Sequence, residues 1–573
     1  MKITTTQPVR WLACLLALLT IVACNPVAAS DEGQPPTAVP IPPASPTAAA
    51  PSPETRPAPA TLPPPATPTA APTAAATATP TALPPQFTNP PDEALAQTAV
   101  AFNAELIRPE MGDTGLWQFA PGTFVHPLAL VVRDDTAYLL DGGRVLAFDL
   151  AQPAAPEVLL APGDEVEGVP VIEPLDIFAA PDGLLALDRA GDVYRRAWGA
   201  AAWALERYDR PIGDTSSHYY VGLDGYENGR FLLETSYKYV MQYVDGVQQA
   251  LWMLPEARAV DVAAAGSGVY ALLQEMDSEA GSLHLYRDTA TVTAFRPPDL
   301  IHQPRQVVAG ETAVYVLDEN GRRLLVFSPD YGQLRQIWQL PAEVSAVGLT
   351  AVGDLLLAGR DRLYFANQPQ RLAAMGGGPQ LPEPQPHDPA FLGGIRGFVS
   401  PIGPNIAARD LQMPGAPRHY RLGVHQGSDF YWSLDSPVYA AADGVVIRAM
   451  HDYVQPFPAE FAARQAEAVQ LGYTSEEALD FYRGRQVWIQ HDNGLVSRYV
   501  HLNSIDYRVQ EGQTVTQGQL IGTVGNSGSP GSLESEDSDV HLHFELWLGE
   551  HYIGQFLRPV ETRYWIEHIL FGR

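Results

Sequence analysis

The stretch His541-Leu-His-Phe-Glu-Leu546 alternates polar and apolar residues, a pattern typical of a half-buried β-strand. Because strand side chains alternate between two faces, one face carries three polar groups: His541, His543 and Glu545. The opposite face carries three apolar groups that suit a core: Leu542, Phe544 and Leu546. We therefore predict a strand that presents two histidines side by side from a packed sheet.

A hairpin upstream delivers a third histidine. Gln486–His491 and Leu495–Val500 flank Asp492-Asn-Gly494, and Asn-Gly between alternating strands is a strong hairpin signal. The second strand of this hairpin leads directly into His501. We expect His501 to lie at a strand end.

A loop further upstream carries His425 and Asp429, among small residues that suit a loop: Gly423, Gly427 and Ser428. Two histidines and one aspartate can hold a single Zn²⁺ and leave a fourth position open. Two further histidines then remain to handle protons and developing charge. His-Glu-x-x-His does not occur in the sequence, so the helix-based zinc protease design is absent. These residues predict a metal-dependent hydrolase.

Five segments, taken in order, resemble the lysostaphin/LytM-type zinc endopeptidases of cell-wall peptidoglycan: His425-x-x-x-Asp429, Pro437–Val446, Arg498-Tyr-Val-His501, Gly512–Asn526 and His541-Leu-His-Phe-Glu545. The resemblance covers residues 393–573. It implies a small antiparallel β-sheet groove and one Zn²⁺ bound by His425, Asp429 and His543. It also implies that His541 is the general base and that His501 stabilises the transition state.

The sequence departs from the family pattern in two places. Phe430-Tyr-Trp-Ser-Leu-Asp435 replaces an Ile-x-x-x-Pro-like run, and its aromatic residues either line the substrate groove or belong to the core. Residues 453–484 have helical periodicity and predict an insertion between two strands, which narrows the cleft or acts as a lid. We expect its second helix to begin at Thr474, with Glu477 completing a capping box.

Residues 110–370 contain paired apolar strands that start at positions 137, 184, 231, 269, 314 and 355. Repeated hairpins with a period in the forties predict a β-propeller. We expect six blades, with five or seven left open. A Gly/Pro-rich linker at 371–392 then separates this region from the peptidase-like domain at 393–573.

Residues 1–24 have a positive start, a short apolar run and the ending Ile21-Val-Ala-Cys24, which resembles the lipobox of bacterial lipoproteins. This resemblance implies that Cys24 is acylated; an ordinary secretory signal is the alternative. Cys14, the other cysteine, lies in the removed segment, so no disulfide is expected. Residues 25–92 are rich in Pro, Ala and Thr and predict a disordered tether.

The formal net charge is −29, which argues against nucleic acid as a partner. Taken together, the sequence predicts a mainly β, exported protein, lipid-anchored at the outer face of the cell membrane, that hydrolyses the peptide cross-links of peptidoglycan. We expect the propeller to bind a wall polymer or a protein. Two alternatives remain open: a non-catalytic module that regulates another wall hydrolase, and an extracellular protease that cuts Gly-rich proteins.

Overall fold

The computed structural model describes residues 116–573 except 152–154, 207–217, 267, 289–290, 330–331, 333, 341–342, 366–372, 375–379, 383 and 408. The predicted signal segment, the tether and Cys24 lie outside these described residues. Within the described part of the chain, no helix is both long and apolar enough to cross a bilayer.

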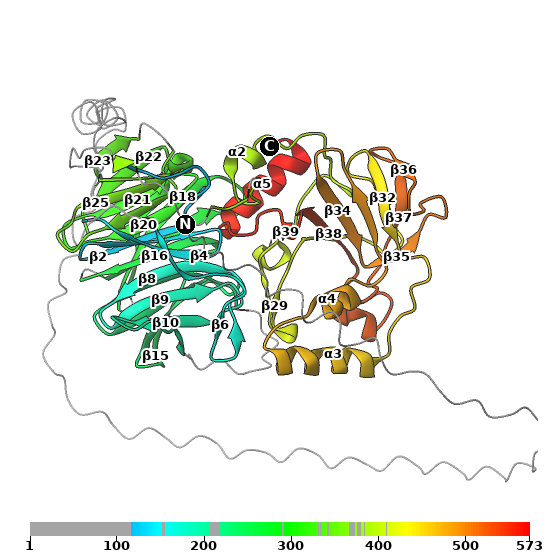
Figure 1. Ribbon diagram of the computed structural model, residues 1–573, viewed down its shortest axis with the longest axis horizontal. Helices are drawn as coiled ribbons and strands as arrows, with labels where there is room; N and C mark the ends of the chain where they lie inside the picture. Colours follow the sequence, from blue (N-terminus) through cyan, green and yellow to red (C-terminus); the bar gives the residue numbers. More distant parts are fainter. Residues whose placement is uncertain are drawn as a thin grey trace, which may run out of the picture. The chain divides into compact units, whose positions relative to one another are not determined.

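Six sheets of mainly antiparallel strands follow one another along the first part of the described chain (Figure 1). Five of them are four-stranded: β2–β5 (Ala129–Arg133, Thr136–Asp141, Arg144–Asp149, Glu157–Leu160), β8–β11 (Pro174–Ala180, Gly183–Asp188, Val193–Ala197, Ala204–Glu206), β12–β15 (Tyr220–Tyr226, Gly229–Glu234, Tyr239–Val244, Val247–Met253), β16–β19 (Ala257–Ala265, Gly268–Glu275, Ala280–Asp288, Thr291–His302) and β20–β23 (Gln306–Ala309, Val314–Asp318, Arg323–Phe327, Leu334–Gln339). The sixth contains β24–β26 (Ala346–Leu349, Leu355–Gly359, Arg362–Phe365), β1 (Leu116–Gln118) and β27 (Ala373–Ala374). A short hairpin, β6 (Glu165–Val166) and β7 (Val169–Pro170), and a 3-10 turn, η2 (Glu319–Gly321), lie between these strands.

The first strand of each sheet contacts the first strand of the next in a closed cycle, from β2 through β8, β12, β16, β20 and β24 back to β2. The ring is completed by β1, which pairs antiparallel with β26 and places Trp117 opposite Leu363. Such a ring leaves only short sheet edges at its rim. The prediction of a six-bladed β-propeller is confirmed.

An acidic residue recurs at the end of the second strand in several blades. Asp141 accepts hydrogen bonds from the backbone N–H of Val125 (3.1 Å) and His126 (2.7 Å). Asp188 accepts from Glu173 (2.9 Å) in the same way. A buried backbone N–H without a partner is costly, so each carboxylate satisfies the segment that enters its blade. The repeated acidic residue at the strand end therefore holds the blade entry in place.

The second domain is built on a seven-stranded antiparallel sheet in the order β30-β38-β34-β33-β32-β36, with β39 paired to β38. Its strands are β30 (Ser428–Tyr431), β38 (His541–Leu548), β34 (Leu495–Val500), β33 (Val487–Gln490), β32 (Gly444–Ala449), β36 (Thr514–Val515) and β39 (His551–Tyr552). A three-stranded sheet comprises β31 (Pro437–Tyr439), β37 (Leu520–Val524) and β35 (Leu502–Ile505), and a two-stranded one β28 (Pro417–Arg418) and β29 (Gly423–Val424). Besides the two helices of the insertion described next, the helices of this region are α2 (Pro389–Leu392), α5 (Pro559–Phe571), η3 (Asp410–Gln412), η4 (His419–Arg421) and η5 (Pro530–Leu533).

Two helices interrupt the larger sheet between β32 and β33: α3 (Pro458–Leu471) and α4 (Glu476–Arg483). The predicted start of the second helix at Thr474 is wrong by one position. Ser475 is the N-cap, and its hydroxyl accepts from Ala478 N–H at 3.2 Å. The Thr474 hydroxyl instead donates to the carbonyl of Arg421 and accepts from its guanidinium, so it ties the helix start to η4.

Buried ion pairs join the C-terminal helix α5 and its approach to propeller residues. Arg558 lies 3.1 Å from Asp261, and Glu561 lies 2.8 Å from His126 and 3.2 Å from Arg305. All five side chains are almost fully buried. Removing one partner of such a pair leaves an uncompensated buried charge, so the loss of any of these side chains is expected to destabilise the protein.

Candidate metal centre

The five residues predicted for the site come from two neighbouring strands and from the positions that directly follow two others. Asp429 on β30 lies directly opposite His543 on β38, and Val500, the last residue of β34, lies opposite His543 on the other side. His501 therefore comes directly after the residue of β34 that pairs with His543. His425 follows β29 and completes the group, so the structure brings all five predicted residues together.

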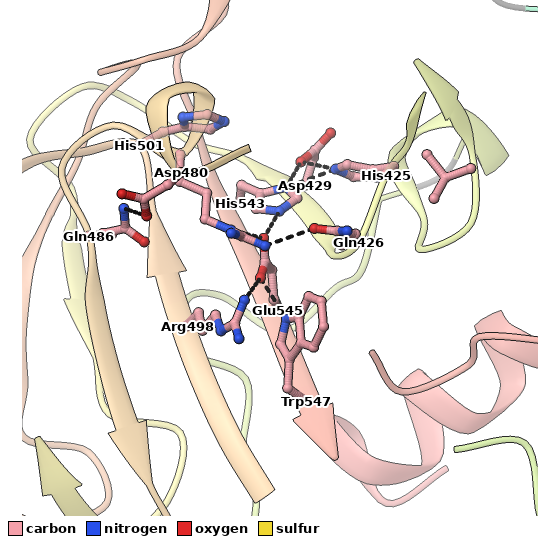
Figure 2. A network of polar contacts seen from close by, with 12 residues as sticks. His425, Gln426, Asp429, Asp480, Gln486, Arg498, His501, His543, Glu545 and Trp547 are labelled. Atoms are coloured by element: carbon pink, nitrogen blue, oxygen red, sulfur yellow. Dashed lines mark hydrogen bonds and ion pairs between the residues drawn. The ribbon is translucent and has the colours of Figure 1, made fainter. Parts of the chain in front are cut away.

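Three donor atoms meet at the base of the site. His425 Nε2 lies 2.9 Å from Asp429 Oδ1 and 2.8 Å from His543 Nδ1. His543 Nδ1 lies 2.9 Å from the same Asp429 oxygen. Figure 2 shows these three side chains pointing toward one another, and all three are buried.

Hydrogen bonds on the far side of each ring decide which nitrogen is free. His425 Nδ1 lies 3.0 Å from the Met413 carbonyl, which can only accept, so Nδ1 carries the proton and Nε2 presents a lone pair. His543 Nε2 lies 3.0 Å from Glu545 Oε1, which leaves Nδ1 as the free nitrogen of the neutral ring. Two imidazole lone pairs and a carboxylate oxygen therefore converge, and they repel one another unless a cation lies between them. This donor set fits Zn²⁺.

The electrostatics of the three residues agree with a cation site. Burial, followed by the Arg418 guanidinium, lowers the pKa of His425 to about 3, so this ring is neutral at neutral pH. Burial alone would raise the pKa of Asp429, but His425 and His541 outweigh it and hold that pKa well below its usual range. Burial would lower the pKa of His543, but hydrogen bonds to Asp429 and Glu545 outweigh it and raise that pKa. A proton and a metal ion therefore compete for His543 Nδ1.

Two more imidazoles, His501 and His541, stand beside the three donors with their ring centroids 4.8 Å apart. His541 Nδ1 lies 2.6 Å from the Asp539 carbonyl, and His501 Nδ1 lies 2.7 Å from the Ser527 carbonyl. Both Nδ1 atoms therefore carry the proton, which leaves each Nε2 able to accept one. Burial, followed by His541 and His543, lowers the pKa of His501 well below its usual value.

The backbone of His501 is strained. Its φ of 60° lies in the left-handed region, which a non-glycine residue enters at a cost of about 1–3 kcal/mol. Two contacts hold it there: its N–H donates to the carbonyl of Arg483 at 3.1 Å, and its ring donates to Ser527. These two contacts fix the backbone of His501 in its strained conformation.

Sequence reasoning placed Glu545 on the polar face of β38 but missed its partners. Glu545 accepts from Arg483 Nε at 2.9 Å. It also accepts from Arg498 Nη1 (3.3 Å) and Trp547 Nε1 (2.6 Å), in addition to its contact with His543 (Figure 2). Burial would raise the pKa of Glu545, but Arg483 first, and then His543, outweigh it and hold that pKa well below its usual value. The carboxylate is therefore ionised. The period-two pattern indicated its face, whereas its arginines come from distant positions.

The five residues line a cleft of about 310 Å³. The aromatic stretch after Asp429 divides between the two roles left open: Phe430 is 2% exposed in the core, whereas Tyr431 is 48% exposed and its ring stacks on His541 at 5.1 Å. Leu479, Tyr482 and Arg483 of α4 line the same cleft. The insertion therefore contributes one wall of the site.

Comparison with known proteins agrees with this geometry. Residues 459–554 match the family model described as Peptidase family M23, and this part of the chain is a LytM-type M23 domain. The matched span contains His501, His541 and His543, whereas His425 and Asp429 precede it.

Two curated relatives come from Vibrio cholerae serotype O1. The chain is 32% identical over 126 residues to "Peptidoglycan DD-endopeptidase ShyA", covering 22% of this chain and 21% of that protein. It is 26% identical over 125 residues to "Peptidoglycan DD-endopeptidase ShyC", covering 22% of this chain and 20% of that protein. The chain thus spans about a fifth of the length of these relatives. Among solved structures, "Streptogramin B lyase structure" aligns at 12% identity with a TM-score of 0.33, covering 45% of this chain and 98% of that chain.

Proposed function

We propose that the protein is a zinc-dependent endopeptidase that hydrolyses peptide cross-links of bacterial cell-wall peptidoglycan. The observation that carries this proposal is the convergence of two imidazole lone pairs and one carboxylate oxygen within 2.8–2.9 Å, beside two further imidazoles. The M23 match supports a peptidase, and the names of the relatives support peptidoglycan as the substrate class.

In this proposal each residue has a distinct task. His425, Asp429 and His543 hold the ion, which when bound supplies positive charge that polarises a carbonyl and makes water more acidic. His541 Nε2 accepts the proton of the attacking water, because its Nδ1–H is already committed to Asp539. The proton then passes to the leaving amine. His501, whose Nδ1–H is committed to Ser527, accepts a hydrogen bond at Nε2 from the attacking water and so stabilises the transition state by orienting that water.

The N-terminal sequence supports a location of this chemistry in the cell envelope as part of the proposal. The lipobox-like Ile21-Val-Ala-Cys24 supports export and acylation at Cys24, with anchoring at the outer face of the membrane. The Pro/Ala/Thr-rich segment 25–92 supports a tether between anchor and enzyme. We assign the propeller the task of binding a wall polymer or a protein partner.

Digestion of purified peptidoglycan tests the proposal. We expect the zinc-loaded protein to release muropeptides with cleaved cross-links, a chelator to stop this release, and added Zn²⁺ to restore it. His543→Ala is expected to remove the activity, with His551→Ala as a matched control on the neighbouring strand β39. Intact cross-links after incubation with zinc-loaded protein would refute the proposal and favour a non-catalytic regulatory module.

A further inference from the structure

The last residue of α4, the second helix of the insertion, contacts groups beside the metal centre. Arg483 ends α4, and its side chain is 5% exposed. Its Nε lies 2.9 Å from Glu545 Oε1, the same oxygen that His543 Nε2 contacts at 3.0 Å. Its Nη2 donates to Gln426 Oε1 at 2.8 Å, and Gln426 follows His425 directly. One guanidinium therefore connects the surroundings of two of the donor residues.

The other cation near Glu545, Arg498, contacts the other carboxylate oxygen. Arg498 donates to Oε2 at 3.3 Å, and Trp547 donates to the same oxygen at 2.6 Å. Oε1, the oxygen that faces His543, has Arg483 as its cationic partner. Without Arg483, Glu545 loses the contact that fixes Oε1 against the imidazole.

The backbone next to Arg483 supports His501 as well. The carbonyl of Arg483 accepts from His501 N–H at 3.1 Å, and the carbonyl of Arg485 accepts from Leu502 N–H at 3.0 Å. Between them, Gly484 has a φ of 63°, and a Cβ there would collide with the Ser527 carbonyl that holds the His501 ring. Residues 483–485 thus pack against both the backbone and the ring partner of His501.

The insertion is also fixed along its length. Asp480 on α4 pairs with Arg448 on β32 through two contacts of 2.7 and 2.8 Å and accepts from Gln486 at 3.0 Å. Thr474, just before α4, is bonded to Arg421 in both directions. Contacts at both ends and in the middle of α4 argue against an opening lid.

We propose that Arg483 is a positioning residue that fixes His543 through Glu545 and supports His501 through its main chain, so that the helical insertion is a fixed part of the catalytic centre. This inference rests on the proposed function for its catalytic consequence, but its effect on metal binding stands independently. Groups that orient a metal-ligating histidine typically change metal affinity or activity by about 10–100-fold when removed. We expect a loss in this range when the Arg483 side chain is replaced.

The test uses Arg483→Met, which keeps an unbranched side chain without charge, and Arg483→Lys, which keeps a charge but loses the planar donor fork. Arg464→Met is the matched control, because Arg464 lies on α3 of the same insertion and pairs with Glu467 and Glu477 near the surface. Zn²⁺ affinity is measured by competition with a chromophoric chelator, and kcat and KM are measured on purified peptidoglycan.

We expect Arg483→Met to weaken Zn²⁺ binding about 10–100-fold, Arg483→Lys to weaken it less, and Arg464→Met to leave it unchanged. In the same series, kcat should fall while KM stays near its original value. A folded Arg483→Met protein that binds Zn²⁺ within twofold of the original would overturn the proposal. Normal Zn²⁺ affinities in the unsubstituted protein without any cleavage would instead refute the proposed function alone.

A second variant keeps the proposal testable if Arg483→Met does not fold. Glu545→Gln preserves shape and removes the charge that Arg483 contacts. If Arg483 acts through Glu545, adding Arg483→Lys to Glu545→Gln should cause almost no further loss of Zn²⁺ affinity. Additive losses of the two substitutions would show that Arg483 acts by another route and would overturn the proposal.

Discussion

Glu561 joins the peptidase domain to the propeller through a buried contact whose strength can be measured. The carboxylate is 8% exposed and lies 2.8 Å from His126 and 3.2 Å from Arg305. Burial would raise the pKa of Glu561, but Arg305 and then His126 outweigh it and lower that pKa from 4.5 to about 2. A carboxylate whose pKa is lower in the folded state stabilises that state at pH values above its pKa in the unfolded chain, and this stabilisation is lost as the pH falls toward 2.

The size of the effect follows from the two pKa values. The difference between 4.5 and about 2, at about 1.4 kcal/mol for each pH unit, corresponds to about 3 kcal/mol at pH 7. At pH 3 the same relation leaves about 1 kcal/mol. We therefore expect Glu561→Gln to lower the free energy of unfolding by about 3 kcal/mol at pH 7 and by about 1 kcal/mol at pH 3.

Urea unfolding followed by tryptophan fluorescence at both pH values measures this difference. Glu567→Gln on the same helix is the control, because Glu567 is 29% exposed and lies 3.8 Å from Arg563; we expect it to change the stability by at most about 0.5 kcal/mol. Equal stability of Glu561→Gln and the original protein at pH 7, or a deficit that does not shrink on acidification, would refute the reasoning.

Three further predictions concern the metal centre. His541→Ala is expected to lower kcat about 10²–10⁴-fold in peptidoglycan digestion, because the general base is lost. Its Zn²⁺ affinity, measured by chelator competition, should stay within a few fold of the original. A parallel loss of Zn²⁺ affinity would assign His541 to metal binding instead. Removal of the metal with a chelator is expected to lower the midpoint of thermal unfolding, because a metal ion that binds only the folded state stabilises that state. An unchanged midpoint in calorimetry would contradict a metal site built from His425, Asp429 and His543. Gly484→Ala is expected to destabilise the protein by about 1–3 kcal/mol in urea unfolding, since a side chain at its φ of 63° is strained and meets Ser527; unaltered stability would argue against tight packing there.

Local patterns in the sequence predicted the parts of the site that depend on local rules. The period of two in His541–Leu546 placed three polar groups on one face, and the Asn-Gly turn brought His501 to a strand end. Both results follow from neighbouring residues alone. The helix start failed by one position because Thr474 and Ser475 are both capping residues, and the choice depended on a contact with the distant Arg421.

The supporting contacts of the site were beyond sequence reasoning because they join distant positions. Arg483 and Glu545 are 62 residues apart, and His126 and Glu561 are 435 apart. No periodicity links such pairs. Both pairs depend on how the insertion and the last helix dock, which follows from the packing of the whole fold.

The sheet that contains both β1 and β27 has a mechanical consequence. The chain enters the propeller at β1 and leaves it at β27, and these two strands are parallel neighbours, with Trp117 opposite Ala373. A pull on the residues before Leu116 against the residues after Ala374 therefore slides the two strands along each other and loads their hydrogen bonds in shear. Tension applied to these two segments therefore acts directly on the blade that contains β1 and β27.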